Sequence, residues 1–391
     1  MDAKERIHKA LDHEEPDRVP VSEGTIDNLQ IVKHYGGKYV FQGIKTLLGI
    51  ATRVIPFKDR VIRKLFSWKS TLKGGLATNA RLYRAIGIDM AIGPLSLFPV
   101  KFFPWGYVDE FGRKFRVTRH ASGLDVAFYD GGYFNSFEDY EAFEHHPSID
   151  DGIRATSLQA IAEINEEFGG AIYMIPAFPA LLEATWEGFG IENFSRLMAK
   201  QKEIKKVFDD RGKFALEQAK LATEAGARFM LLFDDYGFKT RLFMHPASFE
   251  RYIFPWLRQI CNHAHNQGAK VLLHSCGNIG KIFEPLIDCG IDAFNPIEPT
   301  AADADYDIFK LKQRYGDKIT LNGNVSPQDL ATKDKDHIIA YTKRLIKECA
   351  PGGGFIIASG HSINPEVKLE NFLAMRETTE KFGKYPITVP D

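Results

Sequence analysis

Short apolar runs alternate with longer amphipathic segments over the second half of the chain. From about Gly169 onward each run is four to six residues long, rich in Val, Ile, Leu and Phe, and a segment with helical spacing follows it. This alternation is typical of repeated strand and helix units that build a parallel sheet. It predicts six strands, at Ala171–Ile175, Arg228–Phe233, Lys270–His274, Asp292–Ile297, Lys318–Leu321 and Gly354–Ile357.

Helical spacing fills the intervals between these strands. The predicted helices include Ile191–Phe208, Phe249–Gln267, Lys281–Cys289 and Lys335–Cys349. Two further apolar runs upstream, Arg18–Val21 and Asp89–Ile92, bring the number of strands to eight, and eight parallel strands close a barrel. We therefore expect an α/β fold, a distorted (β/α)₈ TIM barrel.

Two long segments interrupt this barrel pattern. The first, at about residues 24–86, is basic and partly helical, and the second, at about 100–168, is rich in aromatic and turn residues that predict β-hairpins. The charged segment Met1–Glu15 indicates an N-terminal helical extension, and Tyr385–Asp391 indicates a loose tail. We interpret residues 1–391 as one barrel domain with two insertions.

Composition narrows the classes of partner. Fifty basic and fifty-one acidic residues, with a sequence pI near 6.9, leave no overall field to attract nucleic acid or an anionic membrane. No apolar run approaches the roughly 20 residues that span a bilayer, and the N-terminal segment lacks the apolar core of a signal peptide. Four cysteines are too few for a disulfide framework. We expect a cytoplasmic protein.

Polar residues follow most of the predicted strands. In a TIM barrel the catalytic groups lie at the carboxyl ends of the strands, so these positions form a candidate site. Along the chain they are Ser22-Glu23, Asp234-Asp235-Tyr236, His274-Ser275-Cys276-Gly277-Asn278, Glu298, Asn322-Gly323-Asn324 and Ser359-Gly360-His361. Chemistry this diverse at one end of a barrel indicates an active site.

The pair His274 and Cys276 gives the sharpest signal of a metal site. Residues two apart at a strand end point to the same side, so an imidazole and a thiolate can reach one ion, and such a donor set favours zinc. Glu298 can supply an oxygen ligand, and His361 or Ser359 lies within reach across the barrel mouth. A buried, purely structural cysteine is the alternative interpretation. An open fourth position would distinguish a catalytic from a structural zinc.

Four further residues are candidates for catalysis: Asp234, Asp235, Tyr236 and Asn322. Adjacent carboxylates after an apolar strand are costly to bury without a partner, which favours a functional role for the two aspartates. Capping of the following segment is the alternative for the aspartates, and turn formation beside Gly323 is the alternative for Asn322. Trp186 and Tyr236 are candidates to hold an aromatic ring.

Six stretches spread over nearly the whole chain carry a family resemblance: Pro16 to Val21, Asp109 to Arg113, Asp234-Asp235, Pro255 to Asn278, Gly323-Asn324 and Ser359 to His361. Together they resemble the uroporphyrinogen decarboxylase superfamily and, within it, the corrinoid-linked methyltransferase branch of the O-demethylase type. The resemblance implies a distorted (β/α)₈ barrel. It also implies zinc bound by His274 and Cys276, with Glu298 where related methionine synthases add a glutamate.

The chain departs from both branches of that superfamily. The arginine-rich stretch with which haem-pathway decarboxylases hold substrate carboxylates is absent, and so is the later zinc-binding cysteine of the methyltransferases, whose region holds Ser359 and His361. No cobalamin-binding Asp-x-His-x-x-Gly motif occurs, so a separate corrinoid protein must bring the cobalt. The resemblance implies methyl transfer from a small methylated donor, best an aryl methyl ether, to that corrinoid. A decarboxylase of a smaller substrate and a non-catalytic barrel with a structural metal are the alternatives.

Overall fold

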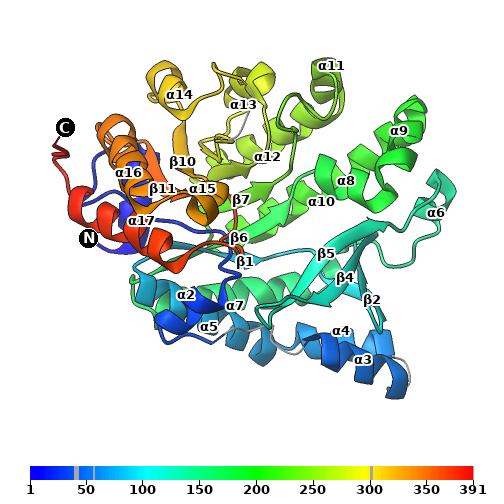
Figure 1. Cartoon of the computed structure of the whole chain (residues 1–391). Helices are drawn as coiled ribbons and strands as arrows, with labels where there is room; N and C mark the ends of the chain where they lie inside the picture. Colours follow the sequence, from blue (N-terminus) through cyan, green and yellow to red (C-terminus); the bar gives the residue numbers. More distant parts are fainter. Residues whose placement is uncertain (39–43, 56–57, 300–302, 391) are drawn as a thin grey trace.

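The computed structural model describes residues 1–38, 44–55, 58–299 and 303–390, and its centre is a curled parallel sheet (Figure 1). Seven strands follow one another in the order β1-β6-β7-β8-β9-β10-β11. Their bounds are β1 Met90–Pro94, β6 Tyr173–Pro179, β7 Phe229–Phe233, β8 Lys270–His274, β9 Ala293–Asn295, β10 Thr320–Val325 and β11 Phe355–Ser359. The six strands predicted after Gly169 and the one predicted at Asp89–Ile92 are confirmed. β9 is short because Pro296, which follows it, has no N–H to donate.

The eighth predicted strand, Arg18–Val21, does not form. In its place Val21 makes a single parallel bridge to Ile357 of β11, and Ser22 makes another to Met90 of β1. Pro20 has no N–H for a ladder, and the guanidinium of Arg18 is engaged by the carboxylate of Asp89. The architecture is therefore TIM-barrel-like, a seven-stranded sheet whose two edges meet one short segment, and not a closed eight-stranded barrel.

Most helices lie around the outer side of this sheet, while others close one of its ends or pack against a second sheet (Figure 1). Their bounds are α1 Ala3–Leu11, α2 Leu29–His34, α3 Ile44–Val54, α4 Lys58–Ser67, α5 Lys69–Ile86, α6 Phe137–Glu141, α7 Ile153–Glu167, α8 Leu182–Phe189, α9 Ile191–Met198, α10 Gln201–Glu224, α11 Pro246–Ser248, α12 Phe254–Asn266, α13 Phe283–Asp288, α14 Ile308–Tyr315, α15 Pro327–Thr332, α16 Lys335–Cys349 and α17 Leu369–Phe382. No described helix combines the length and apolarity needed to cross a bilayer.

The expected N-terminal helix closes the amino-terminal end of the sheet. Apolar side chains of α1 join the inward-facing residues of the strands in one buried cluster, which includes Ile7, Leu11, Phe229, Leu272 and Ile356. Backbone carbonyls at the end of α1 accept hydrogen bonds from neighbouring segments, among them Gly354 N–H to Ala10. With this end filled, the cavity of the sheet opens at the carboxyl ends of the strands.

Two of the predicted helices are interrupted. Ile191–Phe208 divides into α9 and α10 at Lys200, whose backbone (φ −98°, ψ 82°) is not helical. Phe249–Gln267 begins with a π-turn, Phe249–Ile253, before α12. Pro255 lacks the N–H that would bond four residues back, so the first turn widens.

The hairpins predicted within 100–168 form a separate four-stranded antiparallel sheet, β2-β3-β4-β5. Its strands are β2 Pro99–Phe103, β3 Gly106–Asp109, β4 Arg113–Arg119 and β5 Asp125–Gly132. A buried ion-pair network fixes it to α8: Arg113 Nε lies 2.7 Å from Asp109 Oδ2, and Arg113 Nη1 lies 2.8 Å from Glu187 Oε2. The Asp109 to Arg113 stretch therefore positions α8, which borders the site.

The C-terminal segment is not a loose tail, so that prediction is wrong for Tyr385 to Pro390. The hydroxyl of Tyr385 donates to the carbonyl of Ala350 at 2.8 Å, and Ile387 and Val389 pack against the main core. Alternating apolar residues hold the segment on the surface of the barrel. Asp391 lies outside the described residues.

Candidate active site

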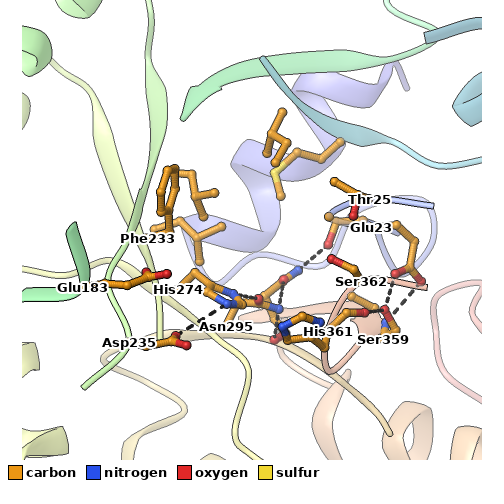
Figure 2. Close-up of a pocket in the computed structure, with 18 residues that line it drawn as sticks. Glu23, Thr25, Glu183, Phe233, Asp235, His274, Asn295, Ser359, His361 and Ser362 are labelled. Carbon is orange, nitrogen blue, oxygen red and sulfur yellow. Dashed lines mark hydrogen bonds and ion pairs between the residues drawn. The ribbon is translucent and has the colours of Figure 1, made fainter. Parts of the chain in front are cut away.

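A cavity of about 240 Å³ opens at the carboxyl ends of the strands (Figure 2). Its floor is apolar and is formed by Met90, Leu231 and Leu272, which belong to the buried cluster inside the sheet. Its walls carry carboxyl, imidazole, amide and hydroxyl groups, while none of the described lining residues is Lys or Arg. Pockets that bind drug-sized ligands measure about 300–1,000 Å³, so this cavity suits a small molecule.

The loops after β7 and β8 are fixed to one another by hydrogen bonds. Tyr236 N–H donates to Ser275 Oγ at 2.9 Å, and Cys276 N–H donates to Asp235 Oδ1 at 2.7 Å. Gly277 has φ +85°, and a Cβ there would lie 2.2 Å from the backbone of Gly237. The glycine after Cys276 is therefore required for the close approach of the two loops.

Three potential metal ligands meet where these loops touch. Ligand atoms of Asp235, His274 and Cys276 all lie within 4.8 Å of one another. Cys276 Sγ is 3.6 Å from His274 Nε2, and His274 Nε2 is 4.0 Å from Asp235 Oδ1. The structure thus brings together the His274 and Cys276 pair expected from their spacing, and it adds Asp235 as the third neighbour.

A chain of amides fixes the proton of His274. Asn295 Nδ2 donates to the backbone carbonyl of Asn322 at 2.9 Å and to Asn322 Oδ1 at 2.6 Å, and Asn322 Nδ2 donates to Ser22 Oγ at 2.6 Å. Because a carbonyl can only accept, Asn295 must turn its oxygen to His274 Nδ1, 2.6 Å away. His274 therefore carries its proton on Nδ1, and the lone pair of Nε2 faces Cys276 and Asp235, as in metal-ligating histidines.

Glu298 and His361 lie around this cluster and outside the group of three. The rings of His274 and His361 have centroids 6.3 Å apart. Burial raises the pKa of the Cys276 thiol well above its usual range, and the charges of Asp235, Glu298 and Glu183 raise it further. So much negative charge around a thiol favours a bound cation, which would offset the repulsion. The donor set of imidazole, thiol and carboxylate fits zinc.

Asp234, although adjacent to Asp235, faces away from the cavity. Its carboxylate accepts from the N–H groups of Leu181, Leu182 and Glu183 at 2.5–2.9 Å, so it satisfies the open amino end of α8. Burial raises the pKa of Asp234 to about 6, against the lowering effect of these N–H groups. Its position supports the capping interpretation.

Of the other residues predicted from the sequence, some line the cavity and some do not. Asn322 lines the cavity and holds the amide chain described above. Tyr236 is wholly buried, with its ring 5.2 Å from that of Phe249, and is not among the lining residues. Trp186 stacks on Phe243 at 5.1 Å outside the cavity. Among the described lining residues, Phe233 provides a phenyl ring.

Sequence reasoning missed two wall residues, Glu183 and Asn295, and it placed Glu23 among the strand-end positions without giving it a role. The position of Glu23 after the expected strand Arg18–Val21 was the signal that placed it in the candidate site. Asn295 is the last residue of β9 and lies three residues before Glu298, which was predicted as an oxygen ligand. Glu183 gave no such signal, because it lies inside α8 and reaches the cavity only through the path of that helix.

Comparisons with known proteins agree on one family. The family model "Uroporphyrinogen decarboxylase (URO-D)" matches residues 115–382, more than half of the chain. A uroporphyrinogen decarboxylase of Coxiella burnetii is 28% identical over 163 residues, which cover 41% of this chain and 42% of that protein. The methylcobamide:CoM methyltransferase MtaA of Methanosarcina barkeri is 24% identical over 229 residues, which cover 58% of this chain and 63% of that protein. The chain thus matches about half the length of these curated relatives.

A solved structure extends the similarity to the full length of the fold. The methyltransferase from Methanosarcina mazei superposes with a TM-score of 0.67, covering 98% of this chain and 99% of that one at 19% sequence identity. At this identity the superposition supports the fold alone. With the family model matched over residues 115–382, which hold six of the seven strands of the parallel sheet, the chain belongs to the uroporphyrinogen decarboxylase (URO-D) family.

Proposed function

We propose that this protein is a methyltransferase that moves a methyl group from a small methylated donor to the cobalt of a corrinoid on a separate protein. The observation that carries the proposal is the cluster of Asp235, His274 and Cys276 at the cavity, with Nε2 of His274 freed by Asn295. The similarity to a protein named as a methylcobamide:CoM methyltransferase supports the same class of reaction.

His274, Cys276 and Asp235 would hold a zinc ion, with Glu298 and His361 near enough to complete its surroundings. This set differs from the expectation that Glu298 is the third ligand. When bound, zinc supplies a Lewis acid that weakens the bond between the donor atom and the methyl carbon. The protein itself orients the imidazole through the amides of Asn295 and Asn322.

The walls of the cavity disfavour decarboxylation of a polycarboxylate. Glu23, Glu183 and Asp235 line it, and no described lining residue brings a guanidinium or ammonium group to pair with a substrate carboxylate. An anionic substrate would therefore find no opposite charge on these walls. A neutral donor with an apolar body fits the floor of Met90, Leu231 and Leu272, and Phe233 offers a ring contact, so an aryl methyl ether is the donor class we favour.

Transfer from such an ether is a displacement at the methyl carbon. The lone pair of cobalt(I) forms the new bond to carbon, the bond between carbon and oxygen breaks, and its electron pair remains on oxygen. Phenolate is a poor leaving group unless its charge is neutralised, so the protein must stabilise that oxygen. Placing the site on loops at an open end of the sheet leaves room for the corrinoid to approach.

The test is formation of methylcobalamin by the purified protein. We expect zinc to copurify, methoxylated phenols with reduced cobalamin to yield methylcobalamin and the demethylated phenol, and a chelator to abolish the reaction. Reaction with methylated amines or thiols but with no ether would refute the ether assignment. Failure to methylate cobalamin from any donor, with release of carbon dioxide from a small carboxylic acid, would favour the decarboxylase alternative.

A further inference from the structure

A single buried carboxyl group occupies the wall of the cavity opposite the metal cluster. Figure 2 shows Glu23 beside Ser359 on one side of the cavity, with Asp235, Glu183 and His274 on the other. Glu23 follows the segment that bridges β1 and β11, and it is 2% exposed. Its neighbour Ser22 receives the hydrogen bond of Asn322, so the two walls are held in register.

The hydrogen bonds of Ser359 leave room for a proton on Glu23. The Ser359 hydroxyl contacts both Glu23 Oε2 and the backbone carbonyl of His361, the latter at 2.5 Å. A hydroxyl has one proton, and the carbonyl can only accept, so Ser359 must donate to His361. The contact between the Ser359 hydroxyl and Glu23 Oε2 is then a hydrogen bond if Oε2 carries the carboxyl proton, while Oε1 accepts from the Ser359 N–H at 3.1 Å.

The surroundings of Glu23 agree with a neutral carboxylic acid. Burial raises the pKa of Glu23 to about 7, although its bonds to Ser359 and the charge of Arg376 act in the opposite direction. The ionisable groups that face it are Arg376 from α17 and Tyr83 from α5, and burial keeps the Tyr83 phenol protonated. The hydrogen bonds of the Glu23 carboxyl group are to Ser359, and in the described part of the chain neither Arg376 nor Tyr83 adds another.

Glu183 is the other buried glutamate of the cavity, and its situation differs. Burial raises the pKa of Glu183, and the negative charges of Asp235 and Glu187 raise it further. A cation bound beside Asp235 would counter that effect, whereas Glu23 lies on the far wall. Asp234 is engaged by three backbone N–H groups and does not reach the cavity. Glu23 is therefore the carboxyl group best placed to keep a proton while a metal is bound.

We propose that Glu23 is the catalytic acid of methyl transfer, and that its carboxyl group donates a proton to the oxygen atom from which the methyl group leaves. This rests on the proposed function. Cobalt(I) supplies the electron pair of the new bond to carbon, the electron pair of the broken bond stays on oxygen, and the proton of Glu23 converts that oxygen to a neutral hydroxyl. Glu23 is left as a carboxylate and regains its proton from water.

The assignment also narrows the donor class. An ether oxygen has two lone pairs, so it can face the metal cluster with one and accept a hydrogen bond from Glu23 with the other, once the carboxyl proton turns from Ser359 to that oxygen. A protonated carboxyl group offers a donor and no full negative charge, so it gives no ion pair to a methylated ammonium compound. Neutral oxygen donors are therefore selected over cationic nitrogen donors.

Replacement of Glu23 by glutamine is the decisive variant. Glutamine keeps the shape and can donate to Ser359 as the protonated acid does, but it has no proton to release. With zinc-loaded protein and reduced cobalamin, we expect Glu23→Gln to slow demethylation of simple methoxybenzenes by about 10²–10⁴-fold, the usual contribution of a general acid. Demethylation of nitro-substituted methoxybenzenes should slow much less, because nitrophenolates leave without needing a proton. Zinc content should be unchanged.

Glu377→Gln, on the exposed side of α17, is the matched control and should react like the unmodified protein with every donor. Equal slowing of all donors by Glu23→Gln, or no slowing, would overturn the assignment. If the unmodified protein transfers no methyl group from any ether to cobalamin, the proposed function is wrong, and this assignment is wrong with it.

A second measurement does not depend on catalysis. At pH 6 the infrared spectrum of the unmodified protein should contain a protonated carboxyl band that Glu23→Gln lacks. Its absence from the unmodified protein would show that Glu23 is ionised and would exclude it as the acid.

Discussion

The two walls of the cavity carry the same functional group in opposite states. On one wall Asp235 receives the N–H of Cys276 and stands beside His274, where a carboxylate can serve as a metal ligand. On the other wall Glu23 is buried against Ser359, and burial raises its pKa to about 7, so it is the carboxyl group proposed to hold a proton. The proposed acid Glu23 and the proposed ligand Asp235 thus differ in their surroundings and not in their functional group. Different surroundings allow two carboxyl groups in one site to play different roles.

The largest expected effect tests the wall of Asp235. Cys276→Ser replaces a soft ligand by a hard one, so zinc affinity should fall by more than the roughly 100-fold that loss of an outer hydrogen-bond partner costs. Metal content after dialysis and titration with a chelator measure this. Cys289→Ser, a buried cysteine at the end of α13, should retain full zinc, and unchanged zinc affinity in Cys276→Ser would rule out the metal site.

The next effect tests the wall of Glu23 through folding. The folded-state pKa of Glu23 is about 7 and lies above its unfolded value of 4.5, so the folded state holds the proton more tightly. The stability that Glu23 contributes is fully present below about pH 4.5 and is lost as the pH rises through about 7. Relative to Glu23→Gln, the unmodified protein should lose about 3 kcal/mol of unfolding free energy between pH 4 and pH 8.

Denaturant unfolding of the two proteins across that pH range measures the difference. Parallel curves at all pH values would mean that Glu23 titrates as an ordinary surface glutamate. The proposed difference between the two walls would then be wrong, because Glu23 would be a carboxylate at neutral pH.

A smaller effect concerns how His274 is held. Asn295→Ala removes the acceptor of the His274 Nδ1 proton, and loss of such a partner typically weakens metal binding by about 10–100-fold. Asn295→Asp keeps an acceptor and should lose less. Zinc titration of the two variants separates the role of the Asn295 oxygen, which accepts from His274, from that of the Asn295 amide group, which donates to Asn322. Full zinc affinity in both variants would show that the amide chain does not orient the imidazole.

The smallest effect separates the neighbours Asp234 and Asp235. Asp234→Ala removes the acceptor at the start of α8 and should lower the free energy of unfolding by about 1–2 kcal/mol, the usual loss for a helix cap. Its zinc stoichiometry should stay normal, while Asp235→Ala should show the reverse pattern. Thermal unfolding and metal analysis of both proteins check this, and zinc loss in Asp234→Ala alone would invert the assignment.

Most of the barrel could be predicted because its strands are apolar runs bounded by turn residues. Seven of the eight expected strands form, and α16 has the predicted bounds Lys335–Cys349. The failure at Arg18–Val21 has a local cause, since Pro20 has no N–H to donate and Arg18 is engaged with Asp89. The two helix breaks were harder to predict. Pro255 could have indicated the break before α12, whereas no residue type marks the break at Lys200.

The site was predictable only as far as strand ends reveal it. His274 and Cys276 are two residues apart on one strand end, so their proximity follows from local geometry. The choice of Asp235 over Glu298 as the third neighbour depends on how the loop after β7 bonds to Cys276, a contact over 41 residues. The pairing of Glu23 with Ser359 spans 336 residues and depends on the curl of the whole sheet.

The amide chain from Ser22 through Asn322 and Asn295 to His274 makes the site poorly modular. A designer who exchanged residues 22–25 to accept a different donor would also remove the hydroxyl that anchors Asn322. That loss would pass through two amides to the imidazole, 252 positions away in the chain. Donor preference and metal affinity are therefore traits that must be engineered together.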